Sequence, residues 1–331
     1  MSQTKGSINM KPKILVVGSL AMDLIVTTNR FCNAGETVIG NGFSTAPGGK
    51  GANQAVQAAR LGAEVAMIGK VGADEFGKSL IATAKESGVN TDFILVTPDA
   101  PTGIANIQIQ KNEHGTENRI LVIPGANFAL TVEDVAFLEE RIAEFDMVIL
   151  QHEIPTEVNC KVAQYAKAKG VPVLLNPAPS APISKELAAC LTYIAPNEHE
   201  AEDITGIRPN SPEATLQAVE VLHEMGIPNV IITLGKEGCI GSDRHTVLAS
   251  PSMDIAPVID PTAAGDSFIG AFCVAIAAGI GVEDAFTFAN CTAGITVTRM
   301  GAQTSLPTLE EVLAALREKG LPTEAYRKLK A

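Results

Sequence analysis

Asp266 stands where a turn of small residues meets an apolar helix, in the segment PTAAGDSFIGAF at 261–272. The first turn of a helix has unpaired N–H groups and the positive end of the helix dipole, which attract an anion. Ala263, Ala264 and Gly265 are small enough for these N–H groups to face an anion, and Asp266 could take a proton from an attacking hydroxyl. Phosphoryl transfer needs such a turn and such a base. The alternative is that Asp266 only caps the helix, as acids commonly do.

The densest glycine cluster, APGGKGANQA at 46–55, precedes a helix with apolar spacing. It contains neither the P-loop pattern nor the GxGxxG pattern, so it is not a standard nucleotide-binding loop. One interpretation is a loop whose backbone approaches a polar ligand, helped by Gly49, Lys50 and Asn53. The other is a tight turn into a helix that packs closely on a sheet, where glycines relieve backbone strain.

Two acids, Asp23 and Glu153, each follow a predicted strand. In an open α/β sheet, ligands bind at the carboxyl ends of the strands. A short carboxylate in that place, such as Asp23, can accept hydrogen bonds from two sugar hydroxyls. The alternatives are that Asp23 stabilises a turn and that Glu153 faces solvent from a loop.

The segment APNEHEAE at 195–202 also follows a strand and begins a helix. Asn197 and Glu200 have the spacing of a capping box, in which each side chain accepts a hydrogen bond from a backbone N–H group at the helix start. The functional alternative is that both side chains project toward phosphate and toward Mg²⁺ with its waters. The strand-to-turn segment TLGKEG at 233–238 could border a nucleotide.

Short apolar runs alternate with helical segments along most of the chain, which is typical of parallel βαβ units. Strand-like segments with alternating patterns, among them DLIVTTNRF and ETVIGNGFSTA, interrupt this order and predict a small β-sheet lid over the site. We therefore predict an α/β fold with a mostly parallel sheet flanked by helices. Its parts are a catalytic domain at 13–19, 48–101 and 126–317, a lid at 20–47 and 102–125, a flexible N-terminus at 1–12 and a C-terminal tail at 318–331.

The composition limits the partners. The chain has 331 residues, of which 46% are hydrophobic, and a net charge of −12. This charge argues against nucleic acid and anionic membranes as main partners, although backbone N–H groups can still bind phosphate. None of the cysteines forms a CxxC pair, the first residues lack a signal-peptide core, and no apolar run has membrane-spanning length. We expect buried free thiols and a cytoplasmic protein.

Two long segments resemble the signatures of the ribokinase-like (phosphofructokinase B) sugar kinases. GGKGANQAVQAARLGAEVAMIGKVGADEFG is similar to the first signature and DPTAAGDSFIGA to the second. The resemblance, which runs from about residue 13 to 317, implies a doubly wound central domain, a β-sheet lid and a homodimer formed through the lids. It also implies Mg·ATP-dependent phosphorylation of a primary sugar hydroxyl, with Asp266 as the general base and the 263–266 turn as the anion hole.

The resemblance also assigns roles to other residues. The sugar-contacting positions are Asp23, Gly49, Lys50, Gly51, Asn53 and Glu153, together with Asp266. The nucleotide-side positions are Asn197, Thr233, Gly235, Gly238, Gly265 and Asn290, and Glu200 is expected to hold Mg²⁺ through water. A monovalent activator, K⁺, is expected at Asp260, Thr262, Thr296, Arg299, Gly301 and Ser305, mostly through backbone carbonyls.

One position departs from the family pattern. After the first strand the family usually has G-S-x-N-x-D, whereas this chain has GSLAMD, so Ala21 replaces an asparagine that helps to hold ribose. A site discriminates strongly where it hydrogen-bonds a substrate hydroxyl, and less where that partner is missing. The expected reaction is phosphorylation of the 5-hydroxyl of D-ribose to ribose 5-phosphate, with 2-deoxyribose, a nucleoside or another small sugar as alternatives. A sugar-binding regulator is the non-enzyme alternative, against which the intact Asp266 argues.

Overall fold

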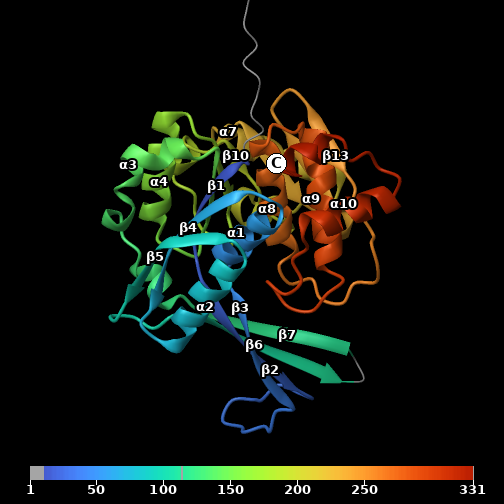
Figure 1. Ribbon diagram of the computed structural model, residues 1–331. Helices are drawn as coiled ribbons and strands as arrows, with labels where there is room; N and C mark the ends of the chain where they lie inside the picture. Colours follow the sequence, from blue (N-terminus) through green and yellow to red (C-terminus); the bar gives the residue numbers. More distant parts are fainter. Residues whose placement is uncertain (1–10, 113–114, 331) are drawn as a thin grey trace, which may run out of the picture.

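The computed structural model describes residues 11–112 and 115–330, and it confirms the predicted α/β fold (Figure 1). The larger sheet has nine strands in the order β13-β12-β11-β10-β9-β8-β1-β4-β5. Neighbouring strands from β11 to β5 in this order pair in parallel, whereas β12 pairs antiparallel with both β11 and β13. These strands are β1 (Lys13–Val17), β4 (Glu64–Gly72), β5 (Val89–Thr97), β8 (Met147–Gln151), β9 (Val173–Asn176), β10 (Tyr193–Ile194), β11 (Asn229–Thr233), β12 (Cys239–Ser242) and β13 (Val247–Ser250). Most of the predicted flexible N-terminus lies outside the described residues.

Strand β1 is buried on both faces because helices cover each side of the sheet. Its sequence KILVV is continuously apolar, as expected for a parallel strand between two helical layers. Ile14 and Val16 pack into one core cluster, and Leu15 and Val17 pack into the other. The first cluster includes helices α1 (Lys50–Arg60), α2 (Glu75–Glu86), α8 (Ala264–Ala277), α9 (Val282–Thr296) and α10 (Leu309–Glu318). The second includes α3 (Leu138–Arg141), α4 (Thr156–Lys169), α5 (Lys185–Ala188), α6 (Glu198–Thr205) and α7 (Pro212–Glu224).

The strand order reverses beside β1, since β4 and β5 lie on one side of it and β8 lies on the other. Such a switch point leaves a crevice at the carboxyl ends of the strands, where ligands bind in open α/β sheets. Ser19 follows β1 and Glu153 follows β8, so both residues lie at this crevice.

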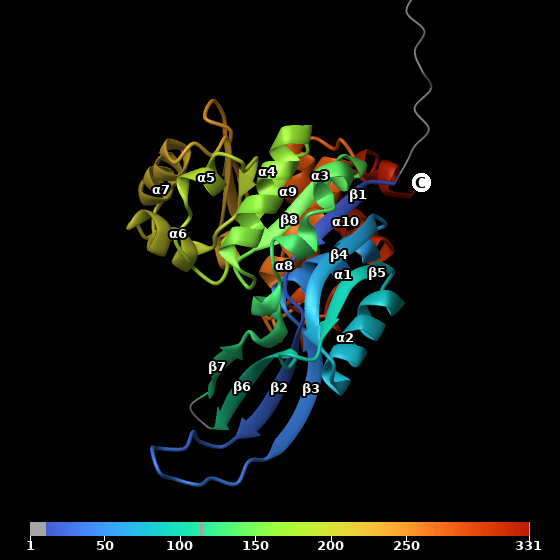
Figure 2. The ribbon, with the colours of Figure 1, turned by 90° about the vertical axis from the view of Figure 1, so that its left-hand side faces the viewer.

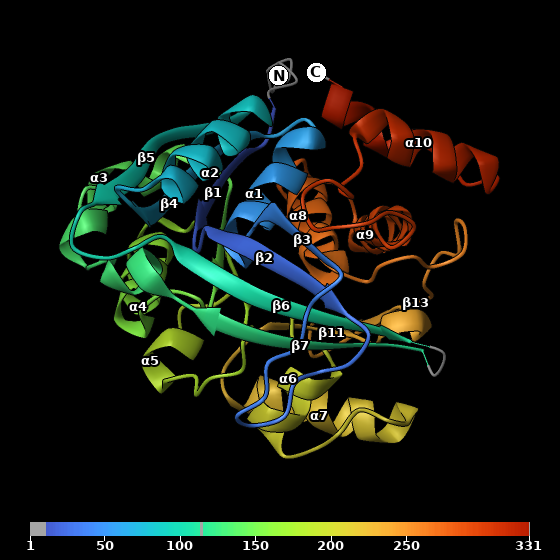
Figure 3. The same ribbon diagram turned by 90° about the horizontal axis from the view of Figure 1, so that it is seen from below.

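A separate sheet of four strands has the order β3-β2-β6-β7 and extends away from the larger domain (Figure 2). It consists of β2 (Ala21–Thr28), β3 (Gly42–Gly48), β6 (Gly103–Asn112) and β7 (Gly115–Ile123), which lie across the view from below in Figure 3. As the patterns predicted, its strands come from two distant segments, and β2 pairs in parallel with β6. Part of the predicted lid segment, 113–114, lies outside the described residues.

The strand predicted from ETVIGNGFSTA is shorter than expected, because β3 begins only at Gly42. Upstream of it, the Glu36 carboxylate forms an ion pair with Arg30 and accepts a hydrogen bond from Asn33 N at 3.1 Å. These local contacts hold the chain in a turn instead of a strand.

The cysteines are free, as predicted, but they are not all buried. Cys239, Cys273 and Cys291 are buried, whereas Cys160 and Cys190 are partly buried and Cys32 is exposed. The prediction of buried thiols is therefore wrong for Cys32, which lies in the loop after β2. Across the described part of the chain, every helix is too short or too polar to cross a membrane.

Helix α1 begins where the chain passes close to the end of β1. A Cβ atom on Gly51 would lie 2.6 Å from Ser19 N and 2.7 Å from the carbonyl carbon of Gly18. On the other side of α1, a Cβ atom on Gly270 of α8 would lie 3.0 Å from the carbonyl oxygen of Gln54. These two glycines therefore let α1 press against the end of β1 and let α8 press against α1.

We expect Gly51→Ala to lower the free energy of unfolding in urea by about 1–3 kcal/mol, because rigid backbone atoms would have to move. Gly265 provides a matched control, since it is the second residue of α8 as Gly51 is of α1, yet a Cβ atom there meets nothing within 4 Å. Gly265→Ala should leave the stability unchanged or raise it slightly. Equal losses in the two variants would contradict the packing role of Gly51.

Candidate active site

The larger of two adjoining cavities, with a volume of about 490 Å³, lies between the four-stranded sheet and the switch point. The four-stranded sheet contributes apolar residues to its wall, among them Ala105, Ile107, Ile120 and Val122. The residues predicted to contact sugar that line it are Asp23, Gly49, Lys50, Asn53, Glu153 and Asp266. Gly51 is the exception, because it packs against the backbone after β1.

The smaller cavity, of about 210 Å³, lies at the carboxyl ends of β9, β10 and β11. Its wall includes Asn176, Asn197, Glu200, Thr233, Ala263, Ala264 and Gly265. Lys50, Ala263 and Asp266 line both cavities. A ligand in one cavity can therefore meet a ligand in the other at Asp266 and the turn before it.

This turn leaves the start of α8 without a side-chain cap. The N-cap residue is Ala263, in the left-handed conformation with φ 61°, and its methyl side chain cannot accept a hydrogen bond. The alternative in which Asp266 caps the helix is therefore wrong. The space around Gly265 is open, so its N–H group can face an anion in the smaller cavity, whereas Ala264 N already donates to Pro261 O at 3.2 Å.

The Asp266 carboxylate is buried and held by side chains of α1. Asn53 Nδ2 donates to Oδ2 at 2.9 Å, and Gln54 Nε2 donates to Oδ1 at 2.9 Å. Burial raises the pKa of Asp266, while the Lys50 ammonium and the two amide donors oppose that rise. Burial lowers the pKa of Lys50, but the charges of Asp266, Glu153 and Glu200 raise it by more, so the side chain stays charged.

Glu153 and Asp23 both line the larger cavity, and their charges interact. Ser19 Oγ donates to Glu153 Oε2 at 2.5 Å, and Lys50 N donates to the same oxygen at 3.0 Å. Burial, followed by the charges of Glu153 and Asp266, raises the pKa of Asp23 to about 7. Glu153 is therefore a fixed carboxylate at the crevice, and the alternative of a solvent-facing loop acid is wrong.

Asn197 and Glu200 form the predicted capping box and also line the smaller cavity. Glu200 Oε2 accepts a hydrogen bond from Asn197 N at 2.9 Å, and Oε1 accepts one from Asn197 Nδ2 at 3.0 Å. The capping box is therefore confirmed, while a role of these side chains toward phosphate and Mg²⁺ stays a prediction. Thr233 lies beside them through a bridge between β11 and Asn197.

Three predicted nucleotide-side residues lie outside both cavity walls. Gly235 and Gly238 flank the short turn after β11, and a Cβ atom on Gly238 would lie 2.1 Å from Ser250 O. Asn290 lies within α9 and donates to Ser250 Oγ at 2.9 Å. Asn290 thus has a structural partner at the end of β13, and its contact with a nucleotide stays a prediction.

Asp260 organises the segment predicted to bind a monovalent cation. Its Oδ1 accepts hydrogen bonds from Thr262 N at 3.0 Å and Thr262 Oγ1 at 2.6 Å, and its Oδ2 accepts one from Gly301 N at 2.9 Å. The hydroxyls of Thr296 and Ser305 donate to the carbonyl oxygens of Thr292 and Ala302. The oxygens of this loop are thus fixed by hydrogen bonds close to the start of α8.

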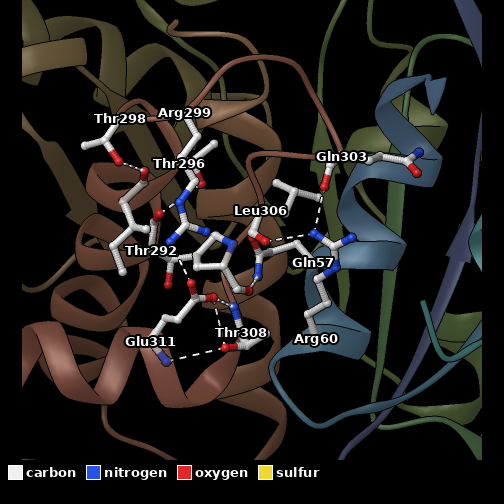
Figure 4. A network of polar contacts seen from close by, with 12 residues as sticks. Gln57, Arg60, Thr292, Thr296, Thr298, Arg299, Gln303, Leu306, Thr308 and Glu311 are labelled. Atoms are coloured by element: carbon white, nitrogen blue, oxygen red, sulfur yellow. Dashed lines mark hydrogen bonds and ion pairs between the residues drawn. The ribbon is translucent and has the colours of Figure 1, made fainter. Parts of the chain in front are cut away.

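A network of polar contacts holds the same loop against α1 and α10 (Figure 4). Arg60 Nη1 donates to Gln303 O at 2.7 Å and to Leu306 O at 2.8 Å. The Arg299 side chain pairs with Glu311 at 2.6 Å. Because a guanidinium has no acceptor atom, only the backbone carbonyl of Arg299 could bind a cation.

Sequence reasoning missed Ser19 and Gln54. Ser19 could have been found, because it is the first polar residue after a buried strand that ends at the switch point. Gln54 had no such signal, since its partner Asp266 comes 212 residues later in the chain.

The fold and the site together define an α/β enzyme of the sugar-kinase class. The chain belongs to the pfkB family of carbohydrate kinases, whose family model matches residues 11–309, so the predicted family is confirmed. It is 42% identical over 299 residues to the ribokinase of Bacillus subtilis (strain 168), covering 90% of this chain and 97% of that protein. It is 35% identical over 299 residues to the deoxyribokinase of Salmonella typhi, covering 90% and 96%. The structure of Arabidopsis thaliana ribokinase complexed with ribose and ATP matches with a TM-score of 0.86 at 32% identity, covering 93% of this chain and 99% of that one.

Proposed function

We propose that this kinase transfers a phosphoryl group from ATP to the 5-hydroxyl of D-ribose, giving ribose 5-phosphate. The observation that carries the proposal is the meeting of two cavities at Asp266 and the uncapped start of α8. The larger cavity offers carboxylates, which suit sugar hydroxyls, and the smaller offers N–H groups, which suit phosphates. Similarity to curated ribokinases over nearly their whole length supports ribose as the substrate.

In this proposal the sugar lies against Asp23, Lys50, Asn53 and Glu153. Asp266 accepts the proton of the attacking hydroxyl, and the N–H groups of the 263–266 turn stabilise the negative charge of the group in transfer. Lys50 lines both cavities and adds positive charge at the point of transfer.

Mg²⁺ fits near Glu200, whose carboxylate oxygens lie in the wall of the smaller cavity. Both oxygens already accept hydrogen bonds from Asn197, so Glu200 would hold the ion through its waters. The ion would neutralise phosphate charge, and Asn197 would fix the orientation of the carboxylate.

Replacing Asp266 with asparagine tests the general base directly. The amide keeps the shape of the side chain but cannot accept the proton, so kcat should fall by a factor of about 10²–10⁴. Binding of sugar and ATP, measured by calorimetry, should change little. Turnover within a few-fold of the wild type would show that Asp266 is not the base.

We propose that K⁺ binds in the loop organised by Asp260 and activates the enzyme without touching the substrate. The oxygens of this loop are hard ligands, which suit an alkali cation, and they lie beside the start of α8. Exchange of Na⁺ for K⁺ at constant ionic strength should raise the rate, and Asp260→Ala should abolish the difference. Equal rates of the wild type in both salts would refute this site.

We also propose that the four-stranded sheet closes over the sugar as a lid and that two chains pair through their lids. Ile120, Val122 and Ile123 of β7 line the larger cavity, while Leu121, which is not part of its wall, is 65% exposed. Consecutive strand residues point to opposite faces, so β7 presents apolar surface on both.

Sedimentation should therefore give twice the mass of one chain. Leu121→Lys should yield monomers, because a charge would enter the apolar contact. Val258→Lys is a matched control, since Val258 is 67% exposed but lies outside the lid. A wild type that sediments as a monomer at assay concentration would contradict the dimer.

2-Deoxyribose is a second candidate substrate because of Ala21. In β2, residues two apart share a face, so an asparagine at position 21 would lie beside Asp23. The nearby amide of Asn127 cannot replace it, because Oδ1 accepts from Leu20 N at 2.9 Å and Nδ2 donates to Leu20 O at 2.8 Å and to Pro124 O at 3.0 Å. Similarity to a curated deoxyribokinase agrees with this interpretation.

Restoring the amide with Ala21→Asn tests this interpretation within one protein. A neutral hydrogen bond is worth about 0.5–1.5 kcal/mol, so ribose should gain up to about tenfold in kcat/KM. 2-Deoxyribose, which lacks the hydroxyl that the asparagine normally meets, should gain little. The ratio of kcat/KM for ribose over 2-deoxyribose should therefore rise in the variant. If neither value changes, position 21 does not contact the sugar.

A further inference from the structure

Gln54 is a fully buried polar residue that none of the expected roles includes. It follows Asn53 in α1, and its side chain has no solvent exposure. Its carboxamide lies between the ends of β8 and β9 on one side and Asp266 of α8 on the other. It therefore connects the sheet to the residue that we propose as the base.

The hydrogen bonds fix which way the Gln54 amide points. Gln151 Nε2 donates to Gln54 Oε1 at 2.7 Å, so the amino group of Gln54 faces the other way. That amino group donates to Asp266 Oδ1 at 2.9 Å and to Asn176 Oδ1 at 3.1 Å. Asn176 Nδ2 in turn donates to Ala195 O at 3.0 Å, which leaves its oxygen facing Gln54. Both N–H bonds of Gln54 are therefore used, and one of them always reaches Asp266.

Gln54 differs from Asn53, the other amide on Asp266. Asn53 belongs to the wall of the larger cavity, where a sugar would compete for its amide, whereas Gln54 is absent from both cavity walls. A ligand in either cavity would therefore not compete for the Gln54 amide.

We propose that Gln54 is a positioning residue, which holds the Asp266 carboxylate at the junction of the two cavities and favours its ionised form. This inference rests on the proposed role of Asp266 as the general base. A base must be ionised before it can accept a proton, and a hydrogen bond to a carboxylate stabilises the ionised state.

The surroundings of Asp266 make this hydrogen bond important. Burial raises the pKa of Asp266, and Glu153 raises it further, while Lys50, Asn53 and Gln54 lower it. Two other acids, Asp23 from β2 and Glu200 from α6, also interact with the charge of Asp266. Loss of the Gln54 donor should therefore move the titration of Asp266 to higher pH.

The test is the dependence of kcat on pH in Gln54→Met, which keeps the length of the side chain but removes the donor. The acidic limb of the profile should move up by about one pH unit. The rate should recover toward that of the wild type at high pH, and KM for the sugar should stay within a few-fold.

Gln57→Met is the matched control. Gln57 is also a fully buried glutamine of α1, one turn further along, but its Nε2 donates to Pro307 O at 2.9 Å and not to Asp266 (Figure 4). The acidic limb of the kcat profile of Gln57→Met should coincide with that of the wild type, although the thermal stability of this variant should fall as it does in Gln54→Met.

Gln54→Glu, which has the same shape, extends the test if Gln54→Met does not fold. Its acid group and Asp266 would share one proton, so the limb should move up at least as far as in Gln54→Met. A folded Gln54 variant with an unmoved limb, or with equal losses of kcat at every pH, would overturn the positioning role. If Asp266→Asn stays active, it is the assignment of the base that has failed.

Discussion

The candidate site depends on the close contact between helices α1 and α8. Gly51 allows α1 to press on the end of β1, and Gly270 allows α8 to press on α1. The first turns of the two helices consequently meet at the switch point, where Asn53 Nδ2 of one lies 2.9 Å from Asp266 Oδ2 of the other. Because both cavities border this contact, a shift of either helix would change the sugar side and the phosphate side together.

The segment that connects the two sheets is also short. β1 ends at Val17 and β2 begins at Ala21, so three residues separate the larger domain from the smaller sheet. Asp23 therefore belongs to the smaller sheet, whereas Glu153 belongs to the larger domain. A sugar that hydrogen-bonds both carboxylates would tie the smaller sheet to the domain, so binding and closure would be one event.

Sequence reasoning succeeded where a short pattern decides the structure. Continuous apolar runs such as KILVV predicted buried parallel strands, and the Asn197–Glu200 spacing predicted a capping box that the structure contains. It failed where distant segments decide. The roles of Gln54 and Gly51 depend on how closely α1 approaches its neighbours, which no short pattern specifies. The smaller sheet shows one success and one failure. Alternating patterns predicted its strands, but they did not predict the late start of β3, which results from contacts of Glu36 within the loop.

The charges in the larger cavity also limit the substrates it can accept. Burial, followed by the charges of Glu153 and Asp266, raises the pKa of Asp23 to about 7, so a further negative charge beside these acids is disfavoured. A neutral polyol can donate hydrogen bonds to these carboxylates, whereas a sugar acid or a sugar phosphate would bring another anion beside them. In the proposed reaction the transferred phosphate would lie at the start of α8, where backbone N–H groups and Lys50 suit an anion. The two ends of the site would therefore differ in sign, so that the carboxylates select a neutral sugar and the helix start accepts the phosphate.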